Sequence, residues 1–460
     1  MIALYDTVLE RVEPLRPKAD APLGLYVCGP TVYGPPHVGH GRLVLVFDIL
    51  RRWLEHEGVA LRHVENVTDV DDKIIDRARR EQRLVSEIAE ESEAQWWQAM
   101  DALGALRPHE APHATAWIPQ MIELVAQLLD RRAAYATSDG VYLDTAKVPD
   151  YGLLKHQRLE ELLPGARIAV DEDKRSPFDF ALWKLAKPQE PTWPAPFGAG
   201  RPGWHTECVV MALGLLGERF CLHGGGADLI FPHHENERAQ AKAAGRCFAR
   251  RWMHSGLVTV DGEKMSKSLG NFTTLRELLE AVEARALRLL VLRAHYRSPM
   301  EVRSELLADA ERAIERLDAL ARRLRDLSAS GAGAAVPEPV QQAAAEVRRA
   351  VAGAMANDLD TPSATAAAFQ AARRANVALD EGDVVLGRAL GAEALESFAA
   401  FGLRSEAGEE PPDALALELL ARRDAARAAR DFAAADALRA ELETLGWKVE
   451  DYAGGSRLRR

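Results

Sequence analysis

The sequence has few cysteines, no basic leader and no long apolar run. Its 460 residues include four cysteines and no Cys-x-x-Cys pair, which excludes a secreted scaffold held by many disulfides. The first residues, MIALYDTVLE, lack the basic and then apolar segments of a signal peptide. The apolar run RLVLVFDILRRW is broken by Asp48 and by arginines, well short of the roughly 18 residues that a membrane span needs. These absences predict a cytoplasmic protein in a reducing compartment.

Two common nucleotide-binding fingerprints are also missing. Gly262 is followed by Glu263, so there is no G-x-x-x-x-G-K-[ST] loop, and HGGGADL (223–229) has leucine where G-x-G-x-x-G needs glycine. The HTEC run is not followed by the P-C-x-x-C of a zinc deaminase. A net charge of −11 argues against indiscriminate binding of nucleic acid. The mildly basic end, GGSRLRR, fits either an RNA contact or a solvated terminus.

The order of apolar and helical segments predicts an α/β fold. A β-rich run over 23–33 precedes a Gly/Pro break, and residues 39–58 then have helical spacing that ends at Gly58. Residues 61–72 read as a second strand and loop, followed by another helix. Strand, turn, helix and strand in this order predict a parallel sheet of the nucleotide-binding kind.

The rest of the chain divides by composition. Residues from about 110 to 190 mix helical, strand-like and polar segments and read as an insertion into the sheet domain. The strand–loop–helix pattern resumes at 220–243 and 251–268. From about 275 onward the chain reads as overwhelmingly helical, with a linker at 328–339.

The stretch His37-Val38-Gly39-His40 is a candidate phosphate site. It lies between a predicted strand and a predicted helix N-terminus, where backbone amides and the helix dipole favour anions. Two imidazoles three residues apart can converge on one phosphate oxygen, and Gly39 leaves room for a nucleoside. The alternative is a turn with two incidental histidines.

A second candidate is Lys264-Met265-Ser266-Lys267-Ser268. Two ammonium groups three residues apart, between Gly262 and Gly270, suit a mobile clamp that neutralises a triphosphate as it reacts. Taken alone, such a run is equally well a solvated surface.

Together these motifs resemble the class I aminoacyl-tRNA synthetases, with HVGH in the place of the HIGH signature and KMSKS over two hundred residues later. The wording CGPTVYGPPHVGHGR, NVTDVDDKI, GRPGWHTEC, HGGGADLIFPHHENE and EKMSKSLGN is similar to that of bacterial cysteinyl-tRNA synthetases. The likeness runs almost from end to end. Its small departures are Val38 for isoleucine and Phe432 where the family often has tryptophan.

The resemblance implies a Rossmann-like parallel-sheet catalytic domain with an insertion, then an α-helical bundle and a small C-terminal anticodon-binding domain. The expected ranges follow the chain: catalytic domain 1–110 and 190–255, connective insertion 111–189, KMSKS and stem-contact region 256–325, bundle 326–400 and anticodon-binding domain 401–460.

The resemblance also implies a zinc site at Cys28, Cys208, His233 and Glu237. Two thiolates, an imidazole and a carboxylate are ligands that zinc accepts, and His233 and Glu237 share a helix face at a spacing of four. His234 could replace His233, but it lies three residues from Glu237, so we favour His233. We expect Cys221 and Cys247 to be ordinary core residues.

Further roles follow from the same likeness. His37, His40, Lys264 and Lys267 are the expected catalytic residues. Thr31, Thr68 and Trp204 are expected around the cysteine substrate, although Trp204 could instead pack on the Pro-rich segment 187–204. ATP is expected to contact His37, Gly39, His40, Gly226, Asp228 and Lys267.

Two other groups of residues each allow two interpretations. Asp69, Asp71 and Asp72 could bind magnesium, but we expect them to cap the helix that starts near Lys73. Arg427, Phe432 and Asp436 fall at helical spacing and are expected on one face that reads anticodon bases, the alternative being a small helical core with surface charges.

The resemblance therefore predicts a monomeric cysteine–tRNA ligase that uses Mg²⁺-ATP, L-cysteine and tRNA-Cys, with one Zn²⁺ per chain. A zinc that takes the substrate sulfur distinguishes cysteine from serine by element, so the insertion is not expected to edit mischarged products. Two alternatives remain: a cysteine ligase acting on an amino sugar, and an inactive tRNA-binding protein.

Overall fold

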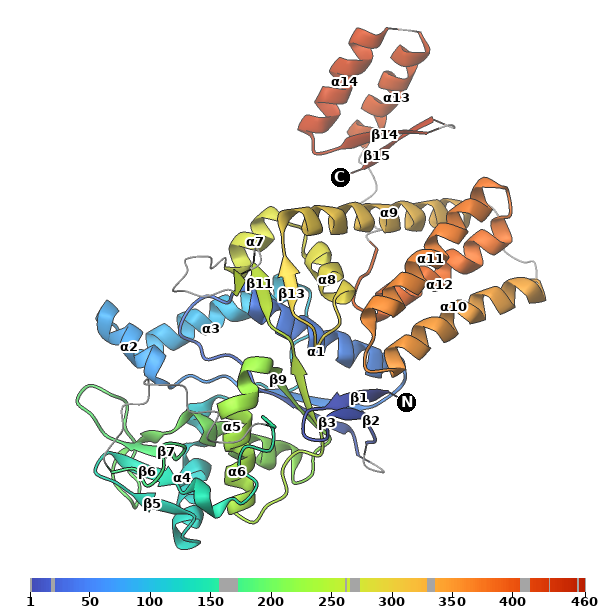
Figure 1. The fold of residues 1–460 in the computed structure, drawn as a ribbon. Coiled ribbons are helices and arrows are strands. Elements are labelled where there is room, and N and C mark those ends of the chain that lie inside the picture. The colour runs from blue at the N-terminus through green and yellow to red at the C-terminus, as the bar shows by residue number, and fades with distance from the viewer. Residues whose placement is uncertain are drawn as a thin grey trace. The chain divides into compact units, whose positions relative to one another are not determined.

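The computed structural model describes residues 2–17, 21–156, 173–260, 263–264, 274–328, 336–405, 414–429, 431–452 and 455–459 (Figure 1). The chain forms two compact units. One comprises Met1–Arg316 and Ala334–Arg404, and the other comprises Leu317–Gly333 and Ser405–Arg460.

The first unit is built on a four-stranded parallel sheet in the order β10-β9-β3-β4. Its strands are β3 (Leu23–Val27), β4 (Leu61–Glu65), β9 (Leu222–Gly226) and β10 (Trp252–Ser255). In register, Leu25 lies opposite both His63 and Leu222. All three pairings are parallel, which confirms the predicted α/β sheet.

Helices cover both faces of this sheet. A Cβ placed on Gly224 would lie 2.3 Å from the Phe47 ring of α1 (Val38–His56), so α1 packs against the face of Leu25 and Val27. Gly24 faces Phe220 and the Leu216 end of α5 (Trp204–Leu216), on the opposite face. Successive side chains of a strand point to opposite faces, so residues of β3 alternate between α1 and α5. Figure 1 shows these two helices on opposite sides of the sheet.

Helix α1 begins and ends where the sequence predicts. The ring of His37 accepts a hydrogen bond from the Gly39 amide, and the ring of His40 accepts one from the His37 amide, which closes the N-terminus as a capping box. At the other end, Gly58 has φ of +76°, a left-handed conformation that glycine adopts without steric cost.

The insertion forms a second sheet of antiparallel strands in the order β5-β6-β7-β8. It comprises η1 (Ala114–Trp117), α4 (Ile118–Asp130), β5 (Ala134–Ala136), β6 (Gly140–Leu143), η2 (Thr145–Lys147), β7 (Phe180–Leu185) and β8 (Gly200–Pro202). Before it come α2 (Asp72–Glu81) and α3 (Val85–Ala102). The sheet extends to Pro202, past the boundary predicted at 189, because β8 pairs with β7.

The remaining strands of the first unit form small sheets. The hairpin β1 (Ala3–Asp6) and β2 (Arg11–Pro14) is antiparallel. A three-stranded sheet joins β11 (Val258–Val260), β12 (Glu263–Lys264) and β13 (Met300–Val302), with β11 in the middle. After β9 come η4 (Ala227–Leu229), η5 (Ile230–His234) and α6 (Glu235–Ala243).

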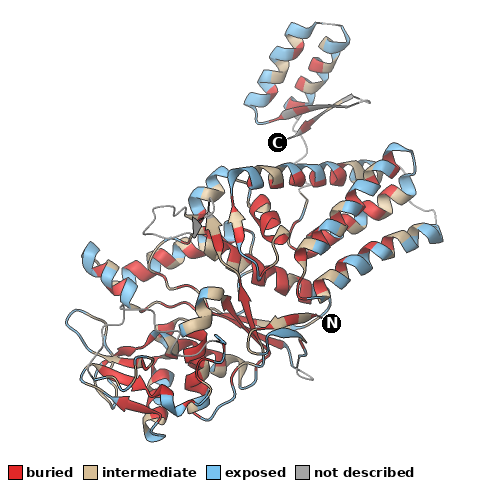
Figure 2. Ribbon diagram, viewed as in Figure 1, coloured by how far each residue is buried: buried red, intermediate tan, exposed pale blue. Residues whose placement is uncertain are grey.

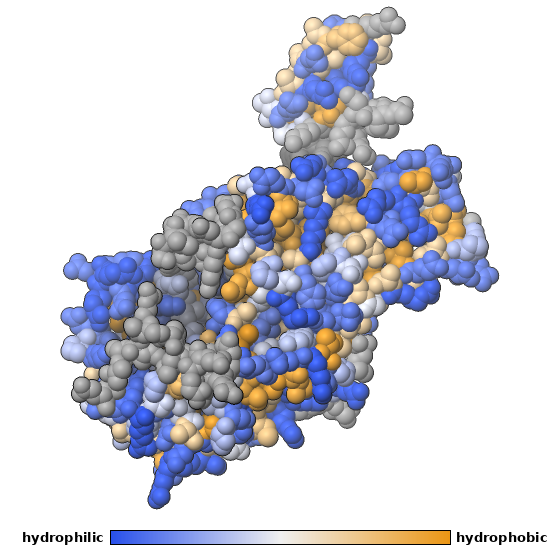
Figure 3. Space-filling view, in the orientation of Figure 1, coloured by the Kyte–Doolittle hydropathy of each residue, from blue (hydrophilic) through white to orange (hydrophobic). Residues whose placement is uncertain are grey.

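The later helices confirm the predicted helical region. They are α7 (Leu275–Ala281), α8 (Ala284–Arg293), α9 (Ser304–Ser328), α10 (Glu338–Ala356), α11 (Thr361–Asp380) and α12 (Val384–Ala400). Helices α11 and α12 each carry a run of buried residues, drawn red in Figure 2, whereas α10 presents a hydrophilic face in Figure 3. Among the described residues no helix is long and apolar enough to cross a membrane.

The sequence led us to expect a helical C-terminal part, but this part of the second unit also contains strands. It has α13 (Ala414–Ala428) and α14 (Phe432–Thr444), followed by a hairpin of β14 (Lys448–Tyr452) and β15 (Gly455–Arg459). Apolar residues from both strands and both helices share one core: Ala416, Leu419, Leu442, Trp447, Val449 and Leu458. The hairpin supplies the apolar surface that two short helices need to bury.

A buried ion pair fixes α1 to α8. Asp48 and Arg288 are 3% and 2% exposed, and the Arg288 guanidinium bonds directly to the Asp48 carboxylate. Burial alone would raise the pKa of Asp48, but Arg288 and Arg52 hold it below its ordinary value. Asp48 also accepts the Leu106 amide at 2.8 Å, so it connects three segments.

We predict that Asp48→Ala lowers the free energy of unfolding by about 3–5 kcal/mol, because it leaves the Arg288 guanidinium buried without its carboxylate. Urea unfolding followed by circular dichroism measures the change. The double variant D48A/R288M should recover part of the loss, since it removes both charges. A double variant that is less stable than D48A would contradict this account.

Candidate active site and metal centre

A cavity of about 340 Å³ lies at the carboxyl ends of β3 and β9. Ligands of open parallel sheets bind at this edge. The cavity brings together eight residues that the sequence predicted for cysteine, ATP or metal: Cys28, Thr31, His37, Gly39, His40, Trp204, Gly226 and Asp228. Another wall consists of residues 255–258, which begin at the last residue of β10.

His37 and His40 lie together at the N-terminus of α1. Their rings stack with centroids 3.7 Å apart, and both line the cavity. The capping bonds of the two rings fix them at the positive end of the helix dipole. The histidines therefore cap the helix and also face the cavity, so the turn and the predicted anion site are one feature.

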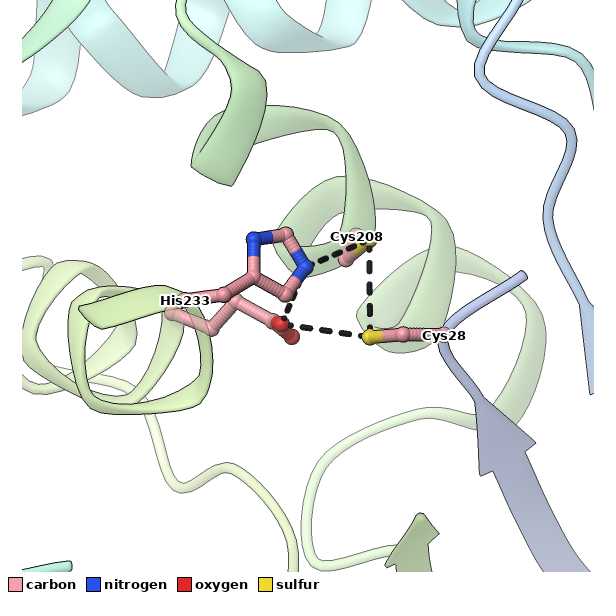
Figure 4. Close-up of side chains that lie close together, drawn as sticks. Cys28, Cys208 and His233 are labelled. Carbon is pink, nitrogen blue, oxygen red and sulfur yellow. Dashed lines mark hydrogen bonds and ion pairs between the residues drawn. The ribbon is translucent and has the colours of Figure 1, made fainter. Parts of the chain in front are cut away.

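The predicted metal ligands converge from four segments of the chain (Figure 4). Cys28 follows β3, Cys208 lies on α5, and His233 and Glu237 lie on η5 and α6. The Sγ atoms of the two cysteines are 3.8 Å apart, and His233 Nε2 is 3.6 Å from Cys208 Sγ. Glu237 Oε1 lies 3.0 Å from His233 Nε2 and 3.3 Å from Cys28 Sγ. All four residues are buried.

These separations fit a tetrahedral cation. Zinc lies about 2.3 Å from sulfur and about 2.0–2.2 Å from nitrogen or oxygen, so two ligand atoms of one tetrahedral site should be roughly 3.3–3.8 Å apart. Three of the separations given above lie between 3.3 and 3.8 Å, and the Glu237–His233 separation is slightly shorter at 3.0 Å. A buried Cys/Cys/His/Glu cluster with this spacing is compatible with a metal site.

The electrostatics favour the charged forms of three of the four residues, whereas burial, Cys208 and Glu237 raise the pKa of the Cys28 thiol well above its ordinary value. Burial opposes ionisation of Glu237, yet His223 and His233 lower its pKa to about 2. Burial likewise disfavours a charged His233, but Glu237 and Cys208 raise its pKa to about 10. Burial raises the pKa of the Cys208 thiol, but the Cys28 and His233 hydrogen bonds outweigh it and lower this pKa to about 6. Ionised thiolate and carboxylate groups are the forms that bind metal.

Two aromatic residues hold His233 in place. The Trp204 ring stacks on the His233 ring with centroids 4.3 Å apart, and His205 Nδ1 lies 2.9 Å from His233 Nδ1. A partner on Nδ1 leaves Nε2 directed at Cys208 and Glu237, the arrangement that orients metal-binding histidines. Trp204 thus lies between the cavity and the cluster, and His205 is a contact that the sequence reasoning missed.

His223 is the main residue of the cluster that the sequence reasoning missed. Its Nε2 lies 3.1 Å from Glu237 Oε2 and 3.6 Å from Cys28 Sγ. His223 pairs with Tyr26 in register, so it faces α5 like Cys28. Cys28, His223, His234 and Glu237 also lie close enough for one ion, so the alternative of His234 stays open. The sequence did contain a signal for this residue: in HGGGADL (223–229), His223 lies close to the end of a predicted strand.

The other predicted substrate residues lie beside this site. Thr31 lines the cavity and forms an isolated bridge with Thr68. Thr68 is buried, and its hydroxyl donates to Glu207 of α5. Lys264 ends β12, where its backbone pairs with Thr259, and Lys267 lies outside the described residues.

The three aspartates after β4 have three different roles. Asp71 caps α2 by accepting the Lys73 amide at 2.9 Å, as expected. Asp72 does not cap: it lies in the first turn and pairs with Lys184 and Arg201. Asp69 instead accepts bonds from the amide and hydroxyl of Thr115 in the insertion. The capping prediction was wrong for these two because it ignored the cations and amides that the insertion supplies.

Two further expectations need correction. Cys221 is buried as predicted, but Cys247 is exposed, because it lies in the turn after α6. Arg427 is in the last turn of α13, whereas Phe432 and Asp436 lie on α14, so the three do not share one helical face. A chain reversal separates residues whose spacing alone fits one helix. Phe432 is nevertheless 62% exposed.

Glu65 is a residue of the cavity wall that the sequence analysis did not predict. It ends β4, is 6% exposed and lines the cavity. The imidazole of His63 lies 3.9 Å from the Glu65 carboxyl group but is uncharged, because burial lowers the pKa of His63 to about 3. Burial raises the pKa of this carboxyl to about 8. No pattern marks it, because an acidic residue at a strand end is usually exposed.

We predict that Glu65→Gln removes a pH dependence of stability. In the wild type the pKa of Glu65 rises from its unfolded value near 4.3 to about 8 on folding. The folded state therefore binds more protons between these values, and stability falls by about 1.4 kcal/mol per pH unit as pH rises. Urea unfolding at pH 5 and pH 8 should show a smaller difference for E65Q than for the control Glu57→Gln, since Glu57 is exposed. Parallel profiles for wild type and E65Q would contradict the assignment.

Comparison with known proteins agrees with this geometry. The family of tRNA synthetases class I (C) catalytic domains matches residues 14–312. The chain is 43% identical to the cysteine–tRNA ligase of Clavibacter michiganensis subsp. michiganensis, over 99% of this chain and 98% of that protein. It is also 43% identical to the cysteine–tRNA ligase of Thermus thermophilus, over 100% and 99% of the two chains.

Solved structures support the fold alone. The Mycobacterium tuberculosis methionyl-tRNA synthetase, solved with methionyl-adenylate, has a TM-score of 0.62 at 15% identity and covers 83% of this chain and 90% of its own. A putative arginyl-tRNA synthetase from Campylobacter jejuni has a TM-score of 0.59 at 12% identity, covering 86% and 96%. The sequence relatives and the cavity together lead to one conclusion: the chain belongs to the cysteine–tRNA ligase family of class I tRNA synthetases.

Proposed function

We propose that this protein activates L-cysteine with Mg²⁺-ATP and transfers it to the terminal adenosine of tRNA-Cys. The observation that carries the proposal is the position of the Cys28, Cys208, His233 and Glu237 cluster, which adjoins the cavity that also contains His37 and His40. A group that recognises sulfur and a group that binds phosphate thus lie on one pocket. The amino-sugar ligase and the inactive tRNA-binding protein gain no support, since full-length relatives carry the ligase name.

In this proposal the nucleotide lies between the α1 N-terminus and residues 255–258. His37 and His40 donate to phosphate oxygens, and the backbone at Gly39 leaves room for the nucleoside. Gly226 and Asp228 lie at the end of β9, where a carboxylate can accept the ribose hydroxyls. Lys264 and Lys267 complete the charge compensation as pyrophosphate leaves, and no protein nucleophile is needed.

Zinc is the metal that best suits the cluster, held by Cys28, Cys208, His233 and Glu237. Bound there, it supplies a soft site that prefers a substrate thiolate to a hydroxyl. The protein places Trp204 and Thr31 beside this site, so the side chain of a small amino acid reaches the cluster while its carboxylate faces His40. Discrimination against serine then needs no editing by the insertion.

The proposal extends to the domains that flank the catalytic one. Residues 405–460 of the second unit would read the anticodon, with exposed Phe432 available for base stacking. Arg427 of α13 and Asp436 of α14, the helix that also carries Phe432, would contribute further contacts to the anticodon. Residues 256–325 would contact the stem, 326–400 would form the supporting bundle, and the enzyme would act as a monomer in the cytoplasm.

The proposed function is tested by ATP–pyrophosphate exchange across a panel of amino acids. We expect exchange with cysteine and none with serine at equal concentration, followed by charging of tRNA-Cys. His40→Asn should lower the exchange rate by about 100- to 1000-fold, because it removes a donor to the reacting phosphate. Equal exchange with serine, or no exchange with cysteine, would refute the proposal.

We expect one zinc per chain in the purified protein, measured by elemental analysis. Cys208→Ala should lose the metal and the preference for cysteine, because it removes one sulfur of the cluster. Cys221→Ala is the matched control, since Cys221 is buried but lies outside the cluster. Equal zinc content in the two variants would show that the cluster is not the metal site.

A further inference from the structure

The guanidinium of Arg42 connects helix α1 to two segments that are distant in sequence. Arg42 lies in the second turn of α1 and is 1% exposed. Its Nη1 donates to the Leu257 carbonyl at 2.7 Å. Its Nη2 reaches carbonyl oxygens of the segment between α8 and β13, those of His295, Tyr296 and Ser298.

These carbonyls lie in the segments that lead into β11 and β13 of the small three-stranded sheet. Leu257 precedes β11 and lines the cavity, and Ser298 lies just before β13. The middle strand β11 pairs with β13 on one side and with β12, which ends at Lys264, on the other. One side chain therefore fixes the sheet that carries Lys264 against the helix that carries His37 and His40.

The two segments that Arg42 bridges also pack tightly on each other. The Gly256 amide donates to the Tyr296 carbonyl at 2.7 Å, and the Met300 amide donates to the Leu257 carbonyl at 2.9 Å. A Cβ on Gly256 would lie 2.4 Å from the Ser298 carbonyl oxygen. Residues 256–258 and 298–300 therefore form one hydrogen-bonded unit, and Arg42 joins this unit to α1.

Burial of this guanidinium has an electrostatic cost. The hydrogen bonds of Arg42 go to carbonyl dipoles, and burial lowers its pKa to about 10. Arg288, by contrast, has the Asp48 carboxylate as its partner. A planar guanidinium with donors on two edges can bond to carbonyls on both segments, which an ammonium group cannot match.

We propose that Arg42 is a positioning residue for the nucleotide: it sets the distance between the α1 N-terminus and the cavity wall at residues 255–258, together with the strand that carries Lys264. This inference rests on the proposed function, in which ATP lies between these two walls. Cysteine recognition should not depend on Arg42, because the metal cluster is held by β3, α5 and α6.

Arg42→Lys tests the inference in cysteine-dependent ATP–pyrophosphate exchange. We expect kcat/KM for ATP to fall by about 100-fold, the loss typical of reacting groups displaced by about 1 Å. The KM for cysteine at saturating ATP should stay within about twofold of the wild type. Arg42→Gln provides a second variant, with the same expectation, in case R42K does not fold.

Arg288→Lys is the matched control. Arg288 is 2% exposed and also donates to backbone carbonyls, those of Leu103, Gly104 and Phe401, none of which lines the cavity. Both lysine variants should lower the Tm, but R288K should leave kcat/KM for ATP near the wild-type value when assayed well below its Tm.

Three outcomes would overturn the inference: an unchanged kcat/KM for ATP in R42K and R42Q, an equal loss in R288K, or an equal rise in the KM for cysteine. The last two would mean that Arg42 acts through general stability. Absence of exchange in the wild type would instead defeat the proposed function, and the inference with it.

Discussion

The contacts of the Glu237 carboxylate with two imidazoles are the interactions on which the buried cluster depends. A fully buried carboxylate is costly unless it is paired, and Glu237 lies 3.0 Å from His233 and 3.1 Å from His223. These contacts join α6 to η5 and to β9, and the Cys28 thiol adds β3. The same contacts also keep the candidate ligand atoms of Cys28, Cys208, His233 and Glu237 within 4.8 Å of one another.

The alternation of β3 places two chemistries next to each other. Tyr26 and Cys28 face α5 and α6, where the metal cluster lies, whereas Val27 faces α1, whose N-terminus carries the stacked histidines. The cavity opens at the end of the strand, where both faces are accessible. One strand and the turn after it therefore connect the buried Cys/His/Glu cluster to the two histidines at the α1 N-terminus.

Much of the fold and site could be predicted from the sequence. The parallel sheet and helix α1 with its glycine end were confirmed, because local periodicity specifies them. The four residues that the resemblance implied as metal ligands, Cys28, Cys208, His233 and Glu237, lie close together. The C-terminal hairpin was missed, because its two strands of five residues each are too short to show a clear periodicity in the sequence. Cys247 was misplaced since burial is a property of the whole fold and not of residue type.

The sequence by itself determined which residue types and which motifs are available, since these depend on short-range order along the chain. The tertiary structure alone decided how distant segments meet. In the folded chain His223 contacts Glu237, and Asp72 pairs with Lys184 instead of capping the helix. Glu65 lies buried at the wall of the cavity. The tertiary structure also placed Arg42 on the carbonyls before β11 and β13. The physical reason is that burial and electrostatic pairing depend on neighbours in space, which no local pattern encodes.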